Sequence, residues 1–343
     1  MKINVKKWSF KENDHLWLED SMSDMYIENN FCDGCGSKMI EISKVVNIKN
    51  EPGIATGLCP DCGYVKRTRN LPQEWFNSHF NNKWLVGNND KISDQQKLVE
   101  DKYVFERLVK YIPVGGKVLD AGCGIGQRLL PFYNSGYDTY GFDPSDHRTN
   151  EASQTLPNLE INTAEKYFEN KSTSYDAIFF FNVLQFVENP FEVIKKAVDN
   201  LSDGGVLFFS VGHFPKDVSN FCQFSHFGVI RSFITLFALK NHFINMDLWP
   251  LEYSQSPFEI ILRKGVKGPN SEKTFNTAKR IDITDIDSFI KKTLHMNRLK
   301  IFGKSKINYQ GRQILLNRSK DMSLSNKPIK FVHTEYDLPI LLK

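Results

Sequence analysis

Hydrophobic residues between positions 117 and 143 fall into two short blocks separated by a glycine-rich turn. Val118 and Leu119 predict a buried strand, and residues 127–133 have the composition of a helix. A second block at 138–142 predicts another strand, which ends in Asp143. The order strand, turn, helix, strand favours an α/β fold with a parallel sheet.

The turn Asp120-Ala-Gly-Cys-Gly-Ile-Gly126 carries the first chemical signal. Its glycines, Gly122, Gly124 and Gly126, remove side chains where a ligand must approach the backbone. Similar turns face a pyrophosphate in dinucleotide-binding proteins. Here Asp120 disfavours a phosphate and favours a cationic, amino-acid-like group. Asp143, about twenty residues downstream, is placed to accept both hydroxyls of a ribose. Together these residues predict S-adenosylmethionine as the cofactor.

At these motifs the chain resembles the class I S-adenosylmethionine-dependent methyltransferases, from about Val114 to Gly265. Their glycine motif matches 120–126, their ribose-binding acid matches Asp143, and their fourth-strand motif matches 175–184. Their next helix and strand match 197–211. The resemblance implies a Rossmann-like, seven-stranded methyltransferase sheet, mostly parallel with one antiparallel strand, between helices. A Rossmann-like domain with an idle glycine turn is the alternative.

The resemblance also implies which residues contact the cofactor. Asp120 and the glycine turn hold the methionine part, Asp143 the ribose, and residues near Thr163 the adenine. The predicted set is Asp120, Gly122, Cys123, Gly124, Gly126, Asp143, Pro144, Thr163, Ala164, Glu165 and Asn182. Cys123 is expected to act as an ordinary small residue, without a catalytic role.

Two Cys-x-x-Cys-Gly motifs give the second chemical signal. They contain Cys32, Cys35, Cys59 and Cys62, and 23 residues separate the pairs. Each motif puts two thiolates on one tight turn, so the two together predict a tetrahedral, structural Zn²⁺ site. Disulfides and a redox pair are the alternatives. The absence of a secretion signal argues against disulfides, and the duplication argues against a redox pair.

Composition and charge limit the partners. The net charge is +4 with acidic and basic residues well mixed, and no run of five like charges marks a nucleic-acid tail. The N-terminus has no signal-type apolar core, and the most apolar segment, 227–243, carries Arg231 and Lys240. We therefore expect a soluble, cytoplasmic protein without a membrane segment.

The length of 343 residues predicts two or three domains. The predicted parts are an N-terminal arm at 1–30, a Cys₄ zinc ribbon at 31–70, a helical lid or linker at 71–112, a class I methyltransferase core at 113–266, and a C-terminal α/β extension at 267–343. In the linker, a helix at 93–111 follows Leu71-Pro-Gln-Glu-Trp-Phe and an Asn-rich stretch. Tyr103 and Phe105 on it either line the cofactor site or pack on the helix face.

Residues around the fourth and fifth strands bear on the acceptor. Many relatives have Glu-His where this chain has Gln185-Phe186, which argues against a Mg²⁺-dependent O-methyltransferase that uses those groups. Methyl transfer to a hydroxyl or carbon acid also needs a base, and histidine is suited to that role at neutral pH. His213 and His226 are the candidates, and either is otherwise a packing or surface residue.

A second resemblance, to the C-methyltransferases of nucleotide-linked deoxysugars, favours His226. Those proteins combine a four-cysteine zinc domain, a class I core and a C-terminal α/β domain. They place a histidine before an aromatic-rich helix. An acid often precedes that histidine, and this chain has Ser225 at the position of the acid.

In the C-terminal part, residues 299–302 predict a strand, Gly303 predicts a turn, and residues 312–316 predict an amphipathic helix. That turn either binds a phosphate, with Lys304, Lys306 and Arg312, or packs as a lid.

The sequence therefore predicts methyl transfer to a small molecule. The leading acceptor is a nucleotide-linked sugar or a related glycan or secondary-metabolite precursor, methylated on carbon or oxygen. RNA or protein methylation, with the ribbon as docking module, is one alternative, and a catalytically inactive cofactor-binding partner is another. The sequence leaves the oligomeric state open.

Overall fold

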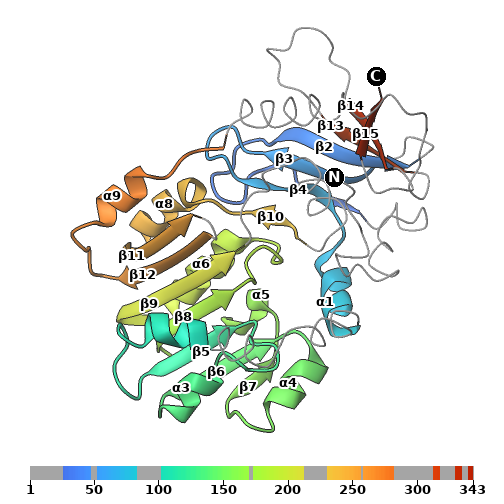
Figure 1. Cartoon of the computed structure of the whole chain (residues 1–343). Helices are drawn as coiled ribbons and strands as arrows, with labels where there is room; N and C mark the ends of the chain where they lie inside the picture. The colour runs from blue at the N-terminus through green and yellow to red at the C-terminus, as the bar shows by residue number, and fades with distance from the viewer. Residues whose placement is uncertain are drawn as a thin grey trace. The chain divides into compact units, whose positions relative to one another are not determined.

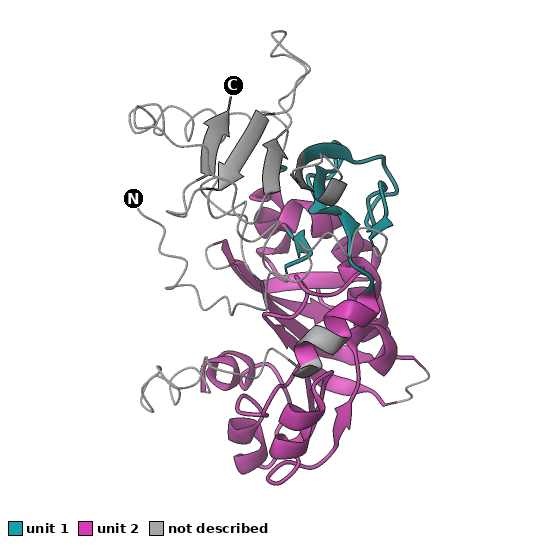
Figure 2. Ribbon diagram, turned by 90° about the vertical axis from the view of Figure 1, so that its right-hand side faces the viewer, with its two compact units in different colours: residues 1–72, 214–234, 280–343 teal, residues 73–213, 235–279 magenta. Residues whose placement is uncertain are grey.

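The computed structural model describes residues 26–47, 52–82, 102–169, 173–211, 230–255, 258–281, 312–316, 329–333 and 339–342. The chain forms two compact units, drawn in two colours in Figure 2. Unit 1 takes residues 1–72, 214–234 and 280–343, and unit 2 takes 73–213 and 235–279. Most of the predicted arm, residues 1–25, lies outside the described residues.

Unit 2 is built on a seven-stranded sheet with the order β11-β12-β9-β8-β5-β6-β7 (Figure 1). Strand β12 is antiparallel to both of its neighbours, and the pairs from β9 to β7 are parallel. This confirms the predicted sheet of mostly parallel strands with one reversed strand. The strands are β5 (Lys117–Ala121), β6 (Asp138–Asp143), β7 (Leu159–Ile161), β8 (Tyr175–Phe181), β9 (Leu201–Val211), β11 (Leu248–Gln255) and β12 (Phe258–Lys264).

The central strands are hydrophobic almost throughout because both faces of the sheet are covered. Phe179, Phe180, Phe208 and Phe209, two from β8 and two from β9, are fully buried. Side chains alternate across a strand, so each consecutive phenylalanine pair fills both sides of the sheet.

Helices pack on these strands. Within unit 2 the structure describes a helix at 102–108 and α1 (Gln73–Asn82), α3 (Leu130–Asn134), α4 (Asp146–Ala152), α5 (Ala164–Tyr167), α6 (Pro190–Asp199), α8 (Leu236–Asn245) and α9 (Ser271–Asn276). Helices α3 and α4 pack on β6, α6 on β9, and α8 and α9 on β11. Asn189 caps α6 by accepting a hydrogen bond from the amide of Glu192 (3.1 Å), and Pro190 begins that helix.

Unit 1 contains an antiparallel sheet with the order β1-β4-β3-β2-β13-β14-β15, and β10 also pairs with β4. The strands are β1 (Ile27–Glu28), β2 (Ile40–Asn47), β3 (Pro52–Leu58), β4 (Val65–Asn70), β10 (Ser232–Phe233), β13 (Arg312–Leu316), β14 (Ile329–His333) and β15 (Pro339–Leu342). In Figure 1 the red C-terminal strands continue the blue N-terminal sheet, since β13 pairs with β2.

The predicted helix at 312–316 is wrong, because these residues form β13. Five residues are too few to separate a helix period from a strand period. Pairing with β2 on one side and β14 on the other decides the conformation. The predicted strand at 299–302 and the turn residues Gly303, Lys304 and Lys306 lie outside the described residues.

Candidate functional site

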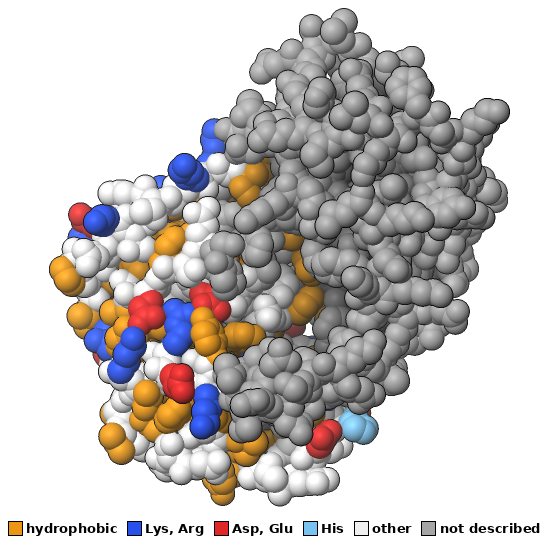
Figure 3. All heavy atoms as spheres, in the orientation of Figure 1, with side chains coloured by type: hydrophobic (Ala, Val, Ile, Leu, Met, Phe, Trp, Pro, Cys, Tyr) orange, Lys and Arg blue, Asp and Glu red, His pale blue; other side chains and the backbone are white. Residues whose placement is uncertain are grey.

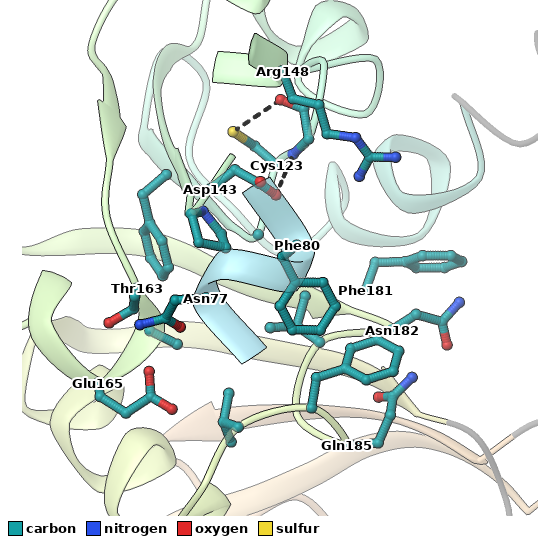
Figure 4. A pocket seen from close by; sticks show the side chains of 18 of the residues that line it. Asn77, Phe80, Cys123, Asp143, Arg148, Thr163, Glu165, Phe181, Asn182 and Gln185 are labelled. Carbon is teal, nitrogen blue, oxygen red and sulfur yellow. Dashed lines mark hydrogen bonds between the residues drawn. The ribbon is translucent and has the colours of Figure 1, made fainter. Parts of the chain in front are cut away.

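A cavity of about 500 Å³ lies in unit 2 where β5, β6, β7 and β8 end at their carboxyl edges. Ligands of open α/β sheets bind at this edge. The cavity is lined by Gln73, Asn77, Phe80, Gly122, Cys123, Gly124, Ile125, Gln127, Arg128, Phe142, Asp143, Pro144, Arg148, Thr163, Ala164, Glu165, Phe181, Asn182, Val183, Gln185, Phe186 and Val187 (Figure 4).

Asp143 is held rigidly at the end of β6. Its Oδ2 accepts a hydrogen bond from the amide of Gly124 (3.0 Å), and its Oδ1 accepts one from the amide of Ser145 (2.9 Å). Burial raises the pKa of this carboxyl, while both amides and the guanidinium of Arg148 oppose the rise. Each oxygen keeps a further lone pair, so the group has acceptor capacity for two ligand hydroxyls.

The three glycines of the turn all have positive φ, but they meet different surroundings. A Cβ at Gly122 would lie 2.5 Å from Val183 Cγ2, and one at Gly126 would lie 2.4 Å from Leu156 Cδ1. At Gly124 the nearest atom is Arg148 Nη1, at 3.6 Å. Packing therefore explains Gly122 and Gly126, whereas a Cβ at Gly124 would make only an ordinary van der Waals contact.

Asp120 does not line the cavity. It is fully buried beneath the turn, and no group in the described part of the chain bonds its Oδ2. Burial raises the pKa of this carboxyl to about 7, Arg128 opposes the rise, and Asp143 adds to it. A buried carboxylate oxygen without a partner fits a nearby cationic ligand group, because such a ligand would compensate the charge.

The other predicted site residues fall into three groups. Pro144, Thr163, Ala164, Glu165 and Asn182 line the cavity together with Gly122, Cys123, Gly124 and Asp143. Gly126 is part of the turn but does not line the cavity. Asn182 has a φ of 59°, a left-handed conformation that is uncommon outside glycine and clusters at functional sites. His213 and His226, the predicted bases, lie outside the described residues, as does Ser225.

Helix α1 supplies lining residues that the sequence analysis missed. Gln73, Asn77 and Phe80 face the cavity from this helix. The sequence does contain one indication of this helix: Pro72 stands directly before Gln73, and proline favours the start of a helix. Tyr103 and Phe105 do not line the cavity; Phe105 packs on the rings of Phe132 and Tyr137, at centroid distances of 5.0 and 6.4 Å.

Two arginines, also missed, stand in the cavity wall. The guanidinium carbon of Arg128 lies 4.1 Å from the ring centroid of Phe181, a cation–π contact. Arg148 lies beside Cys123 and Asp143 (Figure 4). Both cations lower the cost of ionising the two buried aspartates.

In unit 1 the four predicted thiols come together. Their sulfur atoms all lie within 4.8 Å of one another. The Sγ–Sγ distances are 3.6 Å for Cys32 and Cys62, 3.4 Å for Cys35 and Cys59, and 3.9 Å for Cys35 and Cys62. All four are free thiols, so the disulfide alternative does not describe this structure. Four ligands about 2.3 Å from one tetrahedral ion are about 3.8 Å apart, so the cluster fits Zn²⁺.

The two turns that carry the thiols repeat one backbone pattern. The amide of Gly36 bonds the carbonyl of Cys32 (2.9 Å), and the amide of Gly63 bonds that of Cys59 (3.0 Å). Both glycines have positive φ, 76° and 70°. In both turns the glycine after the second cysteine therefore supplies a left-handed backbone conformation that other residues rarely adopt.

The described residues include no helix long and apolar enough to cross a membrane. On the face shown in Figure 3, acidic and basic side chains are interspersed over the coloured part of the surface. No broad area of one sign appears among those coloured residues, which agrees with the mixed charge of the sequence.

The fold and the cavity define a Rossmann-like α/β methyltransferase architecture. Residues 93–246 match the family model described as a methyltransferase domain. A ubiquinone biosynthesis O-methyltransferase of Aliivibrio fischeri is 33% identical over 102 residues, which are 28% of this chain and 44% of that protein. The chain thus spans less than half the length of the curated relatives it matches.

Solved structures with similarity to the chain include two methyltransferases. One is magnesium protoporphyrin IX methyltransferase from Synechocystis with bound SAH, with a TM-score of 0.43, 18% identity, and coverage of 57% of this chain and 100% of that one. The other is a putative S-adenosylmethionine-dependent methyltransferase from Listeria monocytogenes, with a TM-score of 0.40, 18% identity, and coverage of 49% and 100%.

Proposed function

We propose that the protein transfers a methyl group from S-adenosylmethionine to a small-molecule acceptor. The observation that carries the proposal is that Asp143, held by two backbone amides, and the glycine turn at Gly122 and Gly124 line the same cavity. The matched methyltransferase domain supports the same reaction. When bound, the cofactor supplies an electrophilic sulfonium methyl group.

The lining residues fit the three parts of that cofactor. Asp143 accepts the ribose hydroxyls with its remaining lone pairs. Asp120 attracts the methionine ammonium group from beneath the turn, because its Oδ2 has no hydrogen-bond partner in the described part of the chain. Thr163, Ala164 and Glu165 form the adenine end, at the start of α5.

The protein's contribution to the transfer is alignment and, for a hydroxyl or carbon acceptor, removal of one proton. We propose that His226, or else His213, is the base that removes this proton.

A nucleotide-linked sugar is the proposed acceptor, supported by the combination of a Cys₄ cluster with a methyltransferase domain. The Aliivibrio relative, an O-methyltransferase of ubiquinone biosynthesis, favours a second candidate, an acceptor methylated on oxygen, and we take a phenol as the simplest ring of this kind.

We also propose that unit 1 holds one structural Zn²⁺ on Cys32, Cys35, Cys59 and Cys62. Support comes from the sulfur spacing and from the two matching turns. A buried ion pair also links the first turn to β4, the strand that follows the second turn: Lys66 Nζ lies 2.5 Å from Asp33 Oδ1. Four thiolates leave no ligand position for a catalytic water, so the ion stabilises the fold. Metal analysis should find about one zinc per chain.

Calorimetric titration with S-adenosylhomocysteine tests the cofactor site. Asp143→Asn removes a charged hydrogen-bond acceptor, so binding should weaken about ten- to a hundredfold. Asp203→Asn, at an exposed position in β9, is the matched control and should bind as the wild type does. Equal affinity in Asp143→Asn and wild type, with both folded, would contradict the placement. Methyl transfer from labelled S-adenosylmethionine to nucleotide sugars and phenols then tests the acceptor.

A further inference from the structure

One end of the cavity in unit 2 differs in chemistry from the cofactor end. Figure 4 places Cys123, Asp143 and Arg148 at one end, and Asn182 and Gln185 at the opposite end, with Phe80 between them. We call the group formed by Asn77, Phe80, Gln185 and Phe186 the amide–aromatic wall. Two of its members come from α1 and two from the segment that follows β8.

Gln185 is the unusual member of this wall. Its side chain is only 4% exposed, yet its Oε1 has no hydrogen-bond partner in the described part of the chain. A buried acceptor without a donor is costly, and such groups are rare in native proteins. Because Gln185 lines the cavity, a ligand that brings a hydroxyl or N–H group would satisfy it.

The aromatic members offer an apolar surface beside that acceptor. The rings of Phe80 and Phe186 meet edge to face, with centroids 5.6 Å apart and an interplanar angle of 63°. Such a corner presents ring faces and edges to a ligand. It suits a compact ring with one apolar face, such as the C–H face of a sugar or the face of a phenol.

The absence of ionisable groups from the amide–aromatic wall favours a neutral ligand ring. The wall contains amides and phenyl rings, none of which ionises near neutral pH. Of the two cations in the described lining, Arg148 lies at the Asp143 end in Figure 4, and Arg128 stacks on Phe181, which is not a member of the wall. Gln185 is also unable to take a proton as a carboxylate or an imidazole would, so its role is positioning.

We infer that the amide–aromatic wall binds the methyl acceptor as a neutral, hydroxyl-bearing ring, and that Gln185 Oε1 positions the ring by accepting a hydrogen bond from its hydroxyl. The inference rests on the proposed methyltransferase function and deepens it. The same chemistry occurs in two sources, the sugar unit of a nucleotide sugar and a free phenol. A donor-free ring, or one bound through a charge, does not meet the requirement.

The test measures binding of defined probes to the full chain saturated with S-adenosylhomocysteine. Uridine diphosphate glucose and thymidine diphosphate glucose represent the sugar source, and phenol and catechol represent the phenolic source. Anisole is the matched probe without a hydroxyl donor. Gln185→Met keeps the side-chain size but removes the acceptor oxygen, Gln185→Glu retains an acceptor oxygen, and Gln154→Met changes an exposed glutamine outside the cavity.

At least one hydroxyl-bearing probe should bind the wild type more tightly than anisole. Gln185→Met should weaken that probe about tenfold, Gln185→Glu should restore part of the loss, and Gln154→Met should have no effect. The affinity for S-adenosylhomocysteine, measured on each variant, should not change. Binding of the probe that is insensitive to Gln185→Met overturns the inference, and so does failure of every hydroxyl-bearing probe to bind. In both cases intact S-adenosylhomocysteine binding leaves the proposed function standing; loss of that binding in the wild type would instead refute the proposed function.

Discussion

The carboxyl of Asp120 makes the stability of unit 2 depend on pH in a direction opposite to that of most acids. Its pKa rises from the ordinary 3.8 to about 7 because it is buried. Between these two values the folded protein holds a proton that the unfolded chain has released. The free energy of unfolding therefore falls as pH rises across this window, and the contribution levels off above pH 7.

The variant Asp120→Asn removes that titration and nearly keeps the side-chain shape. The ligand-free variant should unfold at higher urea concentration than the wild type near about pH 8, with a gain of no more than about 4 kcal/mol. Near about pH 5 the difference should shrink. Urea unfolding at both pH values checks this, with Asp203→Asn as control. A pH dependence shared by Asp120→Asn and the wild type would show that another group is responsible.

Two glycines of the turn, Gly124 and Gly126, should affect different properties when they are substituted: ligand affinity at Gly124 and the free energy of unfolding at Gly126. Gly124→Ala adds a methyl group to the cavity lining that makes only an ordinary van der Waals contact with Arg148, so it should weaken S-adenosylhomocysteine binding more than it weakens the fold. Gly126→Ala drives a Cβ against Leu156, which is buried, and should cost about 2–4 kcal/mol of unfolding free energy. Both substitutions share the strain of a positive φ, so each controls for the other. Calorimetric titration measures the binding of each variant, and thermal unfolding measures its stability. A larger loss of binding in Gly126→Ala, together with a larger loss of stability in Gly124→Ala, would contradict the prediction.

At the scale of elements, the two cysteine turns give a similar matched pair. Gly36 and Gly63 both have positive φ, but a Cβ at Gly36 meets no atom within 4 Å. A Cβ at Gly63 would lie 2.6 Å from the carbonyl oxygen of Ile281 and 2.7 Å from its amide nitrogen. Backbone atoms cannot rotate away as a side chain does. Gly36→Ala should therefore cost about 1 kcal/mol, and Gly63→Ala clearly more.

Thermal unfolding of the zinc-loaded protein measures that difference, and zinc content measured alongside shows whether the cluster survives. Equal melting temperatures for Gly36→Ala and Gly63→Ala would mean that the segment at 280–281 does not hold the second turn. The test depends on unit 1 alone, since both glycines and Ile281 belong to it.

The elements of unit 2 were predictable because their signals are local and redundant. Continuous apolar runs mark β5 and β8, and a polar turn or a carboxylate ends each of the predicted strands. The strand at 312–316 was not predictable, because its conformation depends on pairing with β2 from the opposite end of the chain. Tertiary pairing outweighs local propensity in such short segments.

The candidate site was predictable only on its cofactor side. The glycine turn and Asp143 are spaced along the sequence in a pattern with a physical meaning. Asn77 and Phe80 carry no comparable signal, because a helix upstream of the sheet reaches the cavity only through the tertiary fold. The partnerless Oε1 of Gln185 likewise becomes visible only when burial and hydrogen bonds are known.

At the scale of the whole molecule, the chain passes between its two units several times. Unit 1 gathers three segments, and unit 2 gathers two. Strand β13 must find β2 across nearly the whole chain, so closing unit 1 orders a long loop. The proposed zinc ligands all belong to unit 1 and the cavity lining belongs to unit 2, so we expect the ion and the cofactor to stabilise different units.

Calorimetric unfolding should therefore separate the two contributions. A chelator should lower only the transition of unit 1, and Cys59→Ser should reproduce that shift, whereas Cys123→Ala should leave the zinc content unchanged. S-adenosylhomocysteine at about 100 times its Kd should stabilise only unit 2, by about 2.7 kcal/mol. Limited proteolysis with mass spectrometry assigns each transition to its residues. A single transition that is shifted by both the chelator and the ligand would mean that the two units unfold together. A ligand of one unit stabilises the other unit only when the two are cooperatively linked.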